Sequence, residues 1–258
     1  MKNLIPLTTL IASTSLAQAA SLVQTTVTLT DNQNNSPPET YISVTSGAEY
    51  YGGTIGGSVS QTAFNNPVQG YSFFNASGGT ISEYAASGGY VSSLTPTDVS
   101  GSGQGSYINL YTTNNPNVSG TFDGAANFSS QTDAVARIVT GDINVSSFTS
   151  GSVYFFFGTF ADAARVTATL SGSGGPDIVV AGDDVISGSQ TGYAMTQFDF
   201  DTSGGYDTLS FTYLNDDNDA SPGSRARISG LVITAVPEPS SSALLGLGLT
   251  SLLLRRRR

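Results

Sequence analysis

The acidic residues are the first candidates for chemistry, because the chain contains no histidine and no cysteine. Ser-His-Asp and Cys-His catalysis, His-ligated transition metals, zinc-thiolate sites and disulfide frameworks are therefore excluded. Glycoside hydrolysis needs only two carboxylates. The glutamates between residues 21 and 236 are Glu39, Glu49 and Glu83. None of them lies in a recognisable catalytic motif, so we predict that the protein is not an enzyme and keep a carboxylate-based glycan hydrolase or lyase as the third alternative.

A second candidate is a calcium site in an acidic loop of the second half of the chain. Hard cations such as Ca²⁺ take six to eight oxygen ligands, which clustered carboxylates can supply. The candidate ligands are Asp216, Asp217 and Asp219. The spacing is not that of an EF-hand, because the loop lacks the glycine at its sixth position and the glutamate at its twelfth. A structural calcium ion is thus the one cofactor that the sequence suggests, and an Asx-rich turn is the alternative.

Tyrosine is the third candidate, since the chain has 12 tyrosines and no tryptophan. A tyrosine ring can stack on a sugar ring while its hydroxyl forms a hydrogen bond. Six tyrosines concentrated in the first half could form such a surface: Tyr41, Tyr50, Tyr51, Tyr71, Tyr84 and Tyr90. The alternative is that these residues fill half-exposed positions on strands.

The elements that must position these residues are strands. Apolar residues alternate with neighbours along several segments, which is the two-residue period of a half-buried strand. These segments are residues 153–157, 166–170, 197–201 and 208–213, and β-rich runs also occupy 23–30, 107–112 and 228–236. Clusters of Gly, Ser, Asn and Asp separate them, as turns do. We therefore predict an all-β fold, a single jelly-roll-type antiparallel β-sandwich over residues 21–236, with long loops in residues 31–105.

The N-terminal residues 1–20 are typical of a secretory signal peptide. Lys2 precedes an apolar stretch over residues 4–16. This stretch is shorter than the roughly 20 residues that cross a bilayer core. The expected cleavage site is the run of small residues that includes Ala17, Ala19 and Ala20.

Residues 237–258 combine a proline-containing turn, an apolar segment and a basic cluster. Pro237 and Pro239, which flank Glu238, prevent a helix from extending upstream, so a helix should begin near Ser240. A helix over residues 240–254 would be roughly 22 Å long, which is short for a hydrocarbon core of about 30 Å. The basic residues that should stay in the cytoplasm are Arg255, Arg256, Arg257 and Arg258.

In its three parts and their order, this tail resembles the PEP-CTERM sorting signal. The resemblance implies an exported protein of a Gram-negative bacterium, anchored transiently in the inner membrane and processed by an exosortase near the Pro-Glu-Pro motif. It also implies delivery to the cell surface or to an exopolysaccharide matrix. The remaining sequence only vaguely resembles jelly-roll carbohydrate-binding modules.

The charge of the predicted domain argues against nucleic acid as a partner. Between residues 21 and 236 the chain has four arginines and eighteen acidic residues, so phosphates would be repelled. We predict a non-catalytic adhesive or structural protein of the surface or extracellular matrix. Its expected partners are the secretion translocase and the exosortase. The alternative is a carbohydrate-binding module for extracellular polysaccharide.

Overall fold

A computed structural model of the chain describes most of the predicted sandwich and leaves both predicted end signals largely outside the described part. The described residues are 19–30, 40–43, 49–52, 60–64, 67–77, 80–96, 108–111, 126–128, 136–160, 163–186, 191–216 and 225–237. Every regular element among them is a β-strand. No helix in this part of the chain is long and apolar enough to cross a membrane.

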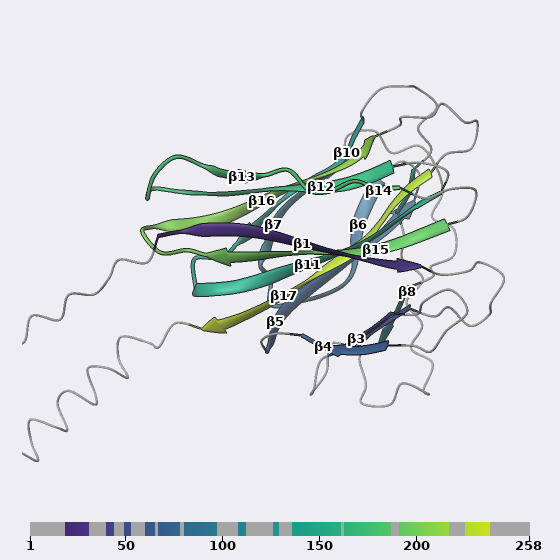
Figure 1. Ribbon diagram of the computed structural model, residues 1–258, viewed down its shortest axis with the longest axis horizontal. Helices are drawn as coiled ribbons and strands as arrows, with labels where there is room; N and C mark the ends of the chain where they lie inside the picture. The colour runs from purple at the N-terminus through teal and green to yellow at the C-terminus, as the bar shows by residue number, and fades with distance from the viewer. Residues whose placement is uncertain are drawn as a thin grey trace, which may run out of the picture.

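The larger of the two main sheets has seven strands (Figure 1). In spatial order its strands are β1 (Ser21–Thr30), β15 (Thr191–Asp201), β11 (Phe148–Phe160), β17 (Arg225–Pro237), β5 (Val68–Ser77) and β6 (Thr80–Ser87), and β9 (Ala126–Phe128) pairs with β17. All pairs are antiparallel. In this order β17 has neighbours along both of its edges, with β11 on one side and β5 and β9 on the other.

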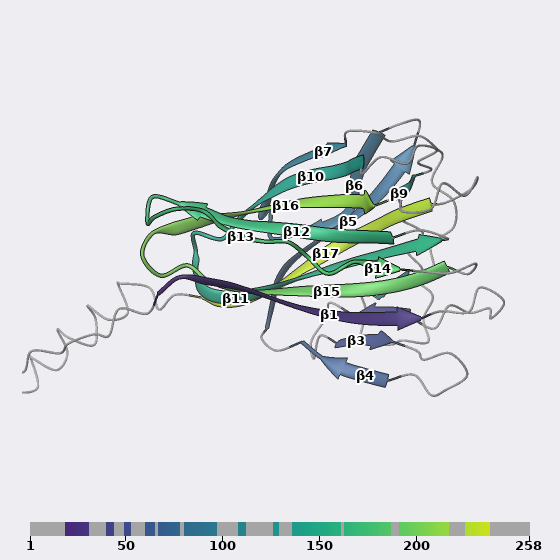
Figure 2. The ribbon, with the colours of Figure 1, turned by 45° about the horizontal axis from the view of Figure 1, so that its top comes forward.

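The second main sheet has six strands. In spatial order they are β13 (Ile178–Val180), β12 (Ala163–Gly172), β16 (Tyr206–Asp216), β10 (Ala136–Asn144) and β7 (Val91–Pro96), and β14 (Val185–Ile186) pairs with β12. In Figure 2 its strands β10, β16 and β12 are seen above β15 and β1 of the first sheet. A separate four-stranded sheet runs β4 (Ser60–Ala63), β3 (Glu49–Gly52), β2 (Thr40–Ser43) and β8 (Ile108–Tyr111), with β2 and β8 parallel.

The core lies between the two main sheets and is rich in aromatic rings. Phe155 of β11 meets Phe211 of β16 with ring centroids 4.9 Å apart, and Phe157 meets Tyr213 at 5.6 Å. All four side chains are buried. Gly141 of β10 leaves room for the Phe211 ring, because a Cβ at that position would lie 2.6 Å from the ring. Burial of each ring stabilises the fold by about 1.5–3 kcal/mol.

The predicted antiparallel β-sandwich is confirmed, and each predicted strand coincides with an observed one. From β10 to β12 and again from β15 to β17, consecutive long strands alternate between the two main sheets. Such alternation is expected for jelly-roll connectivity. The assignment of the sandwich as a jelly roll stays a prediction.

The half-buried character predicted for residues 153–157 is wrong. Every residue from 151 to 157 is buried, so β11 is covered on both faces. On the outer face, Tyr154 packs against Phe64, which follows β4, with ring centroids 4.8 Å apart. The seven-stranded sheet therefore contributes to a second, smaller apolar layer outside the main core.

The expectation of long loops in residues 31–105 is also wrong for residues 68–96, where β5, β6 and β7 join the two main sheets. The reason is that β5 is buried on both faces around its bulge, at Ser72, Phe73 and Phe74. A strand buried on both faces shows no apolar and polar alternation, so the two-residue period gives no signal there.

Candidate functional site

The outer face of the six-stranded sheet is lined by hydroxyl side chains from four neighbouring strands. The inward residues Val139, Gly141 and Ile143 of β10 are buried, and Thr140 and Asp142 between them are partly exposed. The same alternation holds on β12 and β16. We name this surface the hydroxyl face, and it consists of Ser93, Thr95, Thr140, Asp142, Thr167, Thr169, Thr208, Ser210 and Thr212.

Strand register arranges these side chains in straight rows. One row joins Thr95, Thr140, Thr212 and Thr167 across the strands β7, β10, β16 and β12. The next row joins Ser93, Asp142, Ser210 and Thr169. Neighbouring strands lie about 4.8 Å apart and alternate residues about 6.7 Å apart. The hydroxyl face is thus a grid of groups that both donate and accept hydrogen bonds.

Asp142 is the carboxylate at the centre of the second row. The Ser93 hydroxyl donates to its Oδ2 and the Ser210 hydroxyl donates to its Oδ1, each at 2.7 Å. The Ser92 hydroxyl donates to its backbone carbonyl at 3.2 Å. A carboxylate accepts about four hydrogen bonds, so two serines use only part of this capacity. The partly exposed carboxylate is held in one orientation and can still accept hydrogen bonds.

A second carboxylate with serine support lies on the outer face of the seven-stranded sheet. Asp199 accepts at Oδ1 from the Ser152 hydroxyl at 2.5 Å and from Gln197 Nε2 at 2.6 Å. In the strand register, Ser152 is the neighbour of both Asp199 and Thr234. Thr234 is fully buried, and its hydroxyl has no hydrogen-bond partner in the described part of the chain. Unlike Asp142, Asp199 belongs to a surface where buried aromatic side chains also lie.

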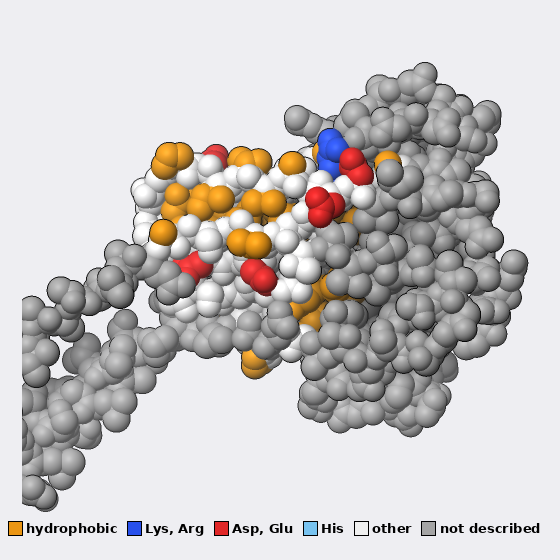
Figure 3. All heavy atoms as spheres, in the orientation of Figure 1, with side chains coloured by type: hydrophobic (Ala, Val, Ile, Leu, Met, Phe, Trp, Pro, Cys, Tyr) orange, Lys and Arg blue, Asp and Glu red, His pale blue; other side chains and the backbone are white. Residues whose placement is uncertain are grey.

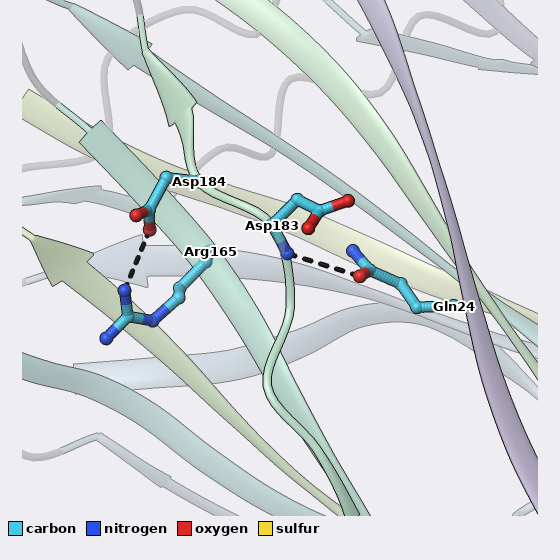
Figure 4. Close-up of polar contacts among 4 residues, drawn as sticks. All are labelled: Gln24, Arg165, Asp183 and Asp184. Carbon is cyan, nitrogen blue, oxygen red and sulfur yellow. Dashed lines mark hydrogen bonds and ion pairs between the residues drawn. The ribbon is translucent and has the colours of Figure 1, made fainter.

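The loop between β13 and β14 connects the edges of the two main sheets (Figure 4). The Asp183 amide donates to Gln24 Oε1 of β1 at 3.2 Å. Asp184 forms an ion pair with Arg165 of β12 at 2.9 Å. These acidic residues therefore serve structural contacts, and the Arg165 charge beside the hydroxyl face is neutralised.

Hydrophobic side chains are exposed along the side where β1 and β13 lie (Figure 3). Among the residues that the structure describes, the exposed large hydrophobics are Val23, with 56% of its surface accessible, and Val179, with 62%. Each belongs to an edge strand of a different main sheet. Single exposed valines such as these are normal on protein surfaces.

The six candidate tyrosines belong to different parts of the fold by the strands that carry them. Tyr41 and Tyr51 are cross-strand partners in the four-stranded sheet, and Tyr50 is adjacent in sequence. Tyr71 and Tyr84 belong to β5 and β6 of the seven-stranded sheet. Their shared role in glycan stacking stays a prediction.

Tyr90, which precedes β7, has a packing role. Its ring lies 5.0 Å from that of Phe148. It also covers Gly70 and Gly88, where an added Cβ would come within 2.6 and 2.5 Å of the ring. Gly88 has a φ of +86°, which favours glycine on its own account. The Tyr90 ring is thus occupied by packing within the fold.

The other predicted side chains are only partly described. Asp216 is the last residue of β16, and Asp217 and Asp219 lie outside the described residues, as does Glu39. Within the described part, no group of three acidic residues could hold a metal ion. Glu49 begins β3 and Glu83 lies in β6, in different sheets. The calcium site stays a prediction.

The predicted sorting motif begins where the sandwich ends. Pro237 is the last residue of β17 and is paired with Phe148 of β11. Just before it, buried Ala235 donates its amide to the Pro67 carbonyl at 3.3 Å and accepts from Gln69 Nε2 at 3.1 Å. Ala19 and Ala20 are described directly before β1. Outside the described residues lie Ala17, Glu238, Pro239, Arg255, Arg256, Arg257 and Arg258.

Comparison with known families assigns these last residues. Residues 235–258 match the family model described as the PEP-CTERM protein-sorting motif. The chain is therefore an exported protein that carries a sorting motif, and the motif implies a cell-surface or extracellular fate. It is a substrate of an exosortase.

The sandwich itself has no such assignment. No curated protein matches the chain. Among solved structures, the VP2 subviral particle of infectious bursal disease virus is similar at 12% identity, over 93% of this chain and 88% of that chain, with a TM-score of 0.17. A TM-score of this size identifies no shared fold.

Proposed function

We propose that the sandwich is a non-catalytic adhesive or structural domain of the cell surface or extracellular matrix. The observation that carries the proposal is the junction at Pro237, where the core strand β17 meets the sorting motif without an intervening linker. Because β17 ends at Pro237, the first residue of the Pro-Glu-Pro motif, cleavage after Pro-Glu-Pro leaves every described strand of the sandwich in the exported product. The motif thus delivers an intact domain.

The proposed route uses the predicted signal peptide and the apolar tail. The secretion translocase exports the chain, and the apolar residues 243–254 hold it transiently in the inner membrane with the arginines in the cytoplasm. The exosortase then releases the acidic domain on the other side of the membrane. The sequence lacks histidine and cysteine, so the nucleophilic and metal chemistries that depend on them are not open to the released domain.

The test is to follow the full chain in cells with and without an active exosortase. We expect a shorter product in the surface or matrix fraction of exosortase-positive cells, and full-length chain in the membrane fraction of exosortase-negative cells. The matched variant replaces Pro237, Glu238 and Pro239 with alanine and should behave as in the negative strain. Loss of the processed protein should reduce attachment of cells to the matrix. Unchanged attachment would contradict the adhesive role.

A second candidate function is binding of extracellular polysaccharide. The observation that favours it is the hydroxyl face, an array of hydrogen-bonding groups in which two serines orient the Asp142 carboxylate. Sugars present hydroxyl groups, which need both donors and acceptors in a binding surface. Pull-down of the processed protein by insoluble polysaccharide tests this function. Complete absence of retention on a panel of polysaccharides would exclude it.

A further inference from the structure

We propose that Asp142 is the centre of a binding site for a neutral polysaccharide on the hydroxyl face. The proposal rests on the second candidate function and names its residues and its ligand class. Asp142 accepts two adjacent sugar hydroxyls, while Ser93 and Ser210 hold its carboxylate in place. The neighbouring threonines contact the sugar units before and after.

The geometry of the carboxylate supports this assignment. Each oxygen of Asp142 receives one serine hydroxyl at 2.7 Å, from strands on opposite sides of β10. This arrangement fixes the carboxylate plane and leaves acceptor capacity on both oxygens. Two neighbouring hydroxyls of a sugar ring can donate to the two oxygens together. Hydrogen bonds to an ionised carboxylate are stronger than those between neutral groups.

The charges around the face select a neutral ligand. Asp142 carries the negative charge at the centre of the face, and the neighbouring arginine, Arg165, is neutralised by Asp184 at 2.9 Å. The domain as a whole is acidic, with eighteen acidic residues and four arginines between residues 21 and 236. An anionic polysaccharide would be repelled by the Asp142 carboxylate and by the net negative charge of the domain. A neutral polysaccharide is not repelled by these charges and still forms the hydrogen bonds to the hydroxyl face.

The grid of the face suits an extended polymer rather than a single sugar. Two straight rows run across four strands, so a chain lying across the sheet meets repeated hydroxyls on either side of Asp142. Exposed hydrogen bonds in competition with water are individually weak. Retention in a matrix would therefore depend on many domains bound to one polymer, which multiplies weak contacts.

The experiment compares two aspartate variants of the processed protein. Asp142→Asn removes the charge from the hydroxyl face, and the matched control Asp199→Asn removes it from a serine-supported carboxylate on the other sheet. The probes are dextran, laminarin and galactomannan as neutral polysaccharides and alginate as an anionic one, with affinity electrophoresis as the readout. We expect Asp142→Asn to weaken binding of at least one neutral probe about tenfold or more. Asp199→Asn should change that binding less than about twofold.

Thermal unfolding of each variant shows whether the sandwich is intact. If Asp142→Asn fails to fold, Thr169→Val in the same row replaces it and should also weaken binding. Equal loss in the Asp142 and Asp199 variants, or preference for alginate, would overturn the proposal and leave polysaccharide binding standing. If the wild-type protein binds none of the probes, the proposal and the second candidate function both fail. The adhesive role would then still be decided by the attachment assay.

Discussion

Replacement of Thr234 by valine should stabilise the protein. Thr234 is fully buried in β17, and its hydroxyl has no hydrogen-bond partner among the described residues. A buried hydroxyl without a partner costs about 1–3 kcal/mol in desolvation. Valine keeps the branched shape and removes the hydroxyl, so the free energy of unfolding should rise by about 1–2 kcal/mol. For a domain of this size, the rise in Tm should be about 2–8 °C.

The matched control is the same substitution at Thr196 in β15. This threonine is also buried, but its hydroxyl accepts a hydrogen bond from Gln24 Nε2 at 2.9 Å. Thr196→Val leaves the Gln24 amide without this acceptor, so the free energy of unfolding should fall by about 1 kcal/mol. Both variants are measured by circular dichroism in thermal and urea unfolding of the processed protein. A lower Tm for Thr234→Val, or equal shifts for the two variants, would refute the reasoning.

Three further predictions follow from the packing and the surface. Phe155→Ala, which empties the centre of the aromatic core, should lower the free energy of unfolding by about 3–5 kcal/mol, and a loss below 1 kcal/mol in urea unfolding would contradict the core assignment. Gly141→Ala should cost about 1–3 kcal/mol because its Cβ overlaps the Phe211 ring; an unchanged urea midpoint would show that the ring can move away. Asp184→Asn removes an ion pair whose side chains are 26% and 35% exposed, so it should change the Tm by no more than a few degrees, and less at high salt.

Several strands that the sequence predicts correctly have one solvent-facing side. β12 is an example, because buried Val166, Ala168 and Leu170 alternate with partly exposed neighbours. The sequence predicts poorly where both faces are covered. β5 gives no alternation because Ser72, Phe73 and Phe74 are all buried. For β11 the sequence predicts the strand but not its burial on both faces, because a layer that includes the distant Phe64 covers its outer face.

The candidate sites also differ in how far the sequence predicts them. The sorting motif is a local sequence, so the residues around Pro237 identify it without any structure. The hydroxyl face depends on which strands become neighbours. Alternation in residues 208–213 marks Ser210 as a surface residue, but no local pattern shows that Ser93, about fifty positions before Asp142, lies beside it. Likewise, the packing of Tyr90 on Phe148 depends on a distant segment.

The central position of β17 links folding to the order in which the chain is made. β17 is the last described strand to be synthesised, yet it lies between β11 and β5 in the middle of its sheet. A chain that stopped before residue 225 would leave two long strand edges unpaired, which invites aggregation. Such a chain would also lack the sorting motif, which begins within the last residues of β17. Only chains complete enough to close the sheet carry the sorting motif, so sorting through this motif is confined to complete copies of the domain.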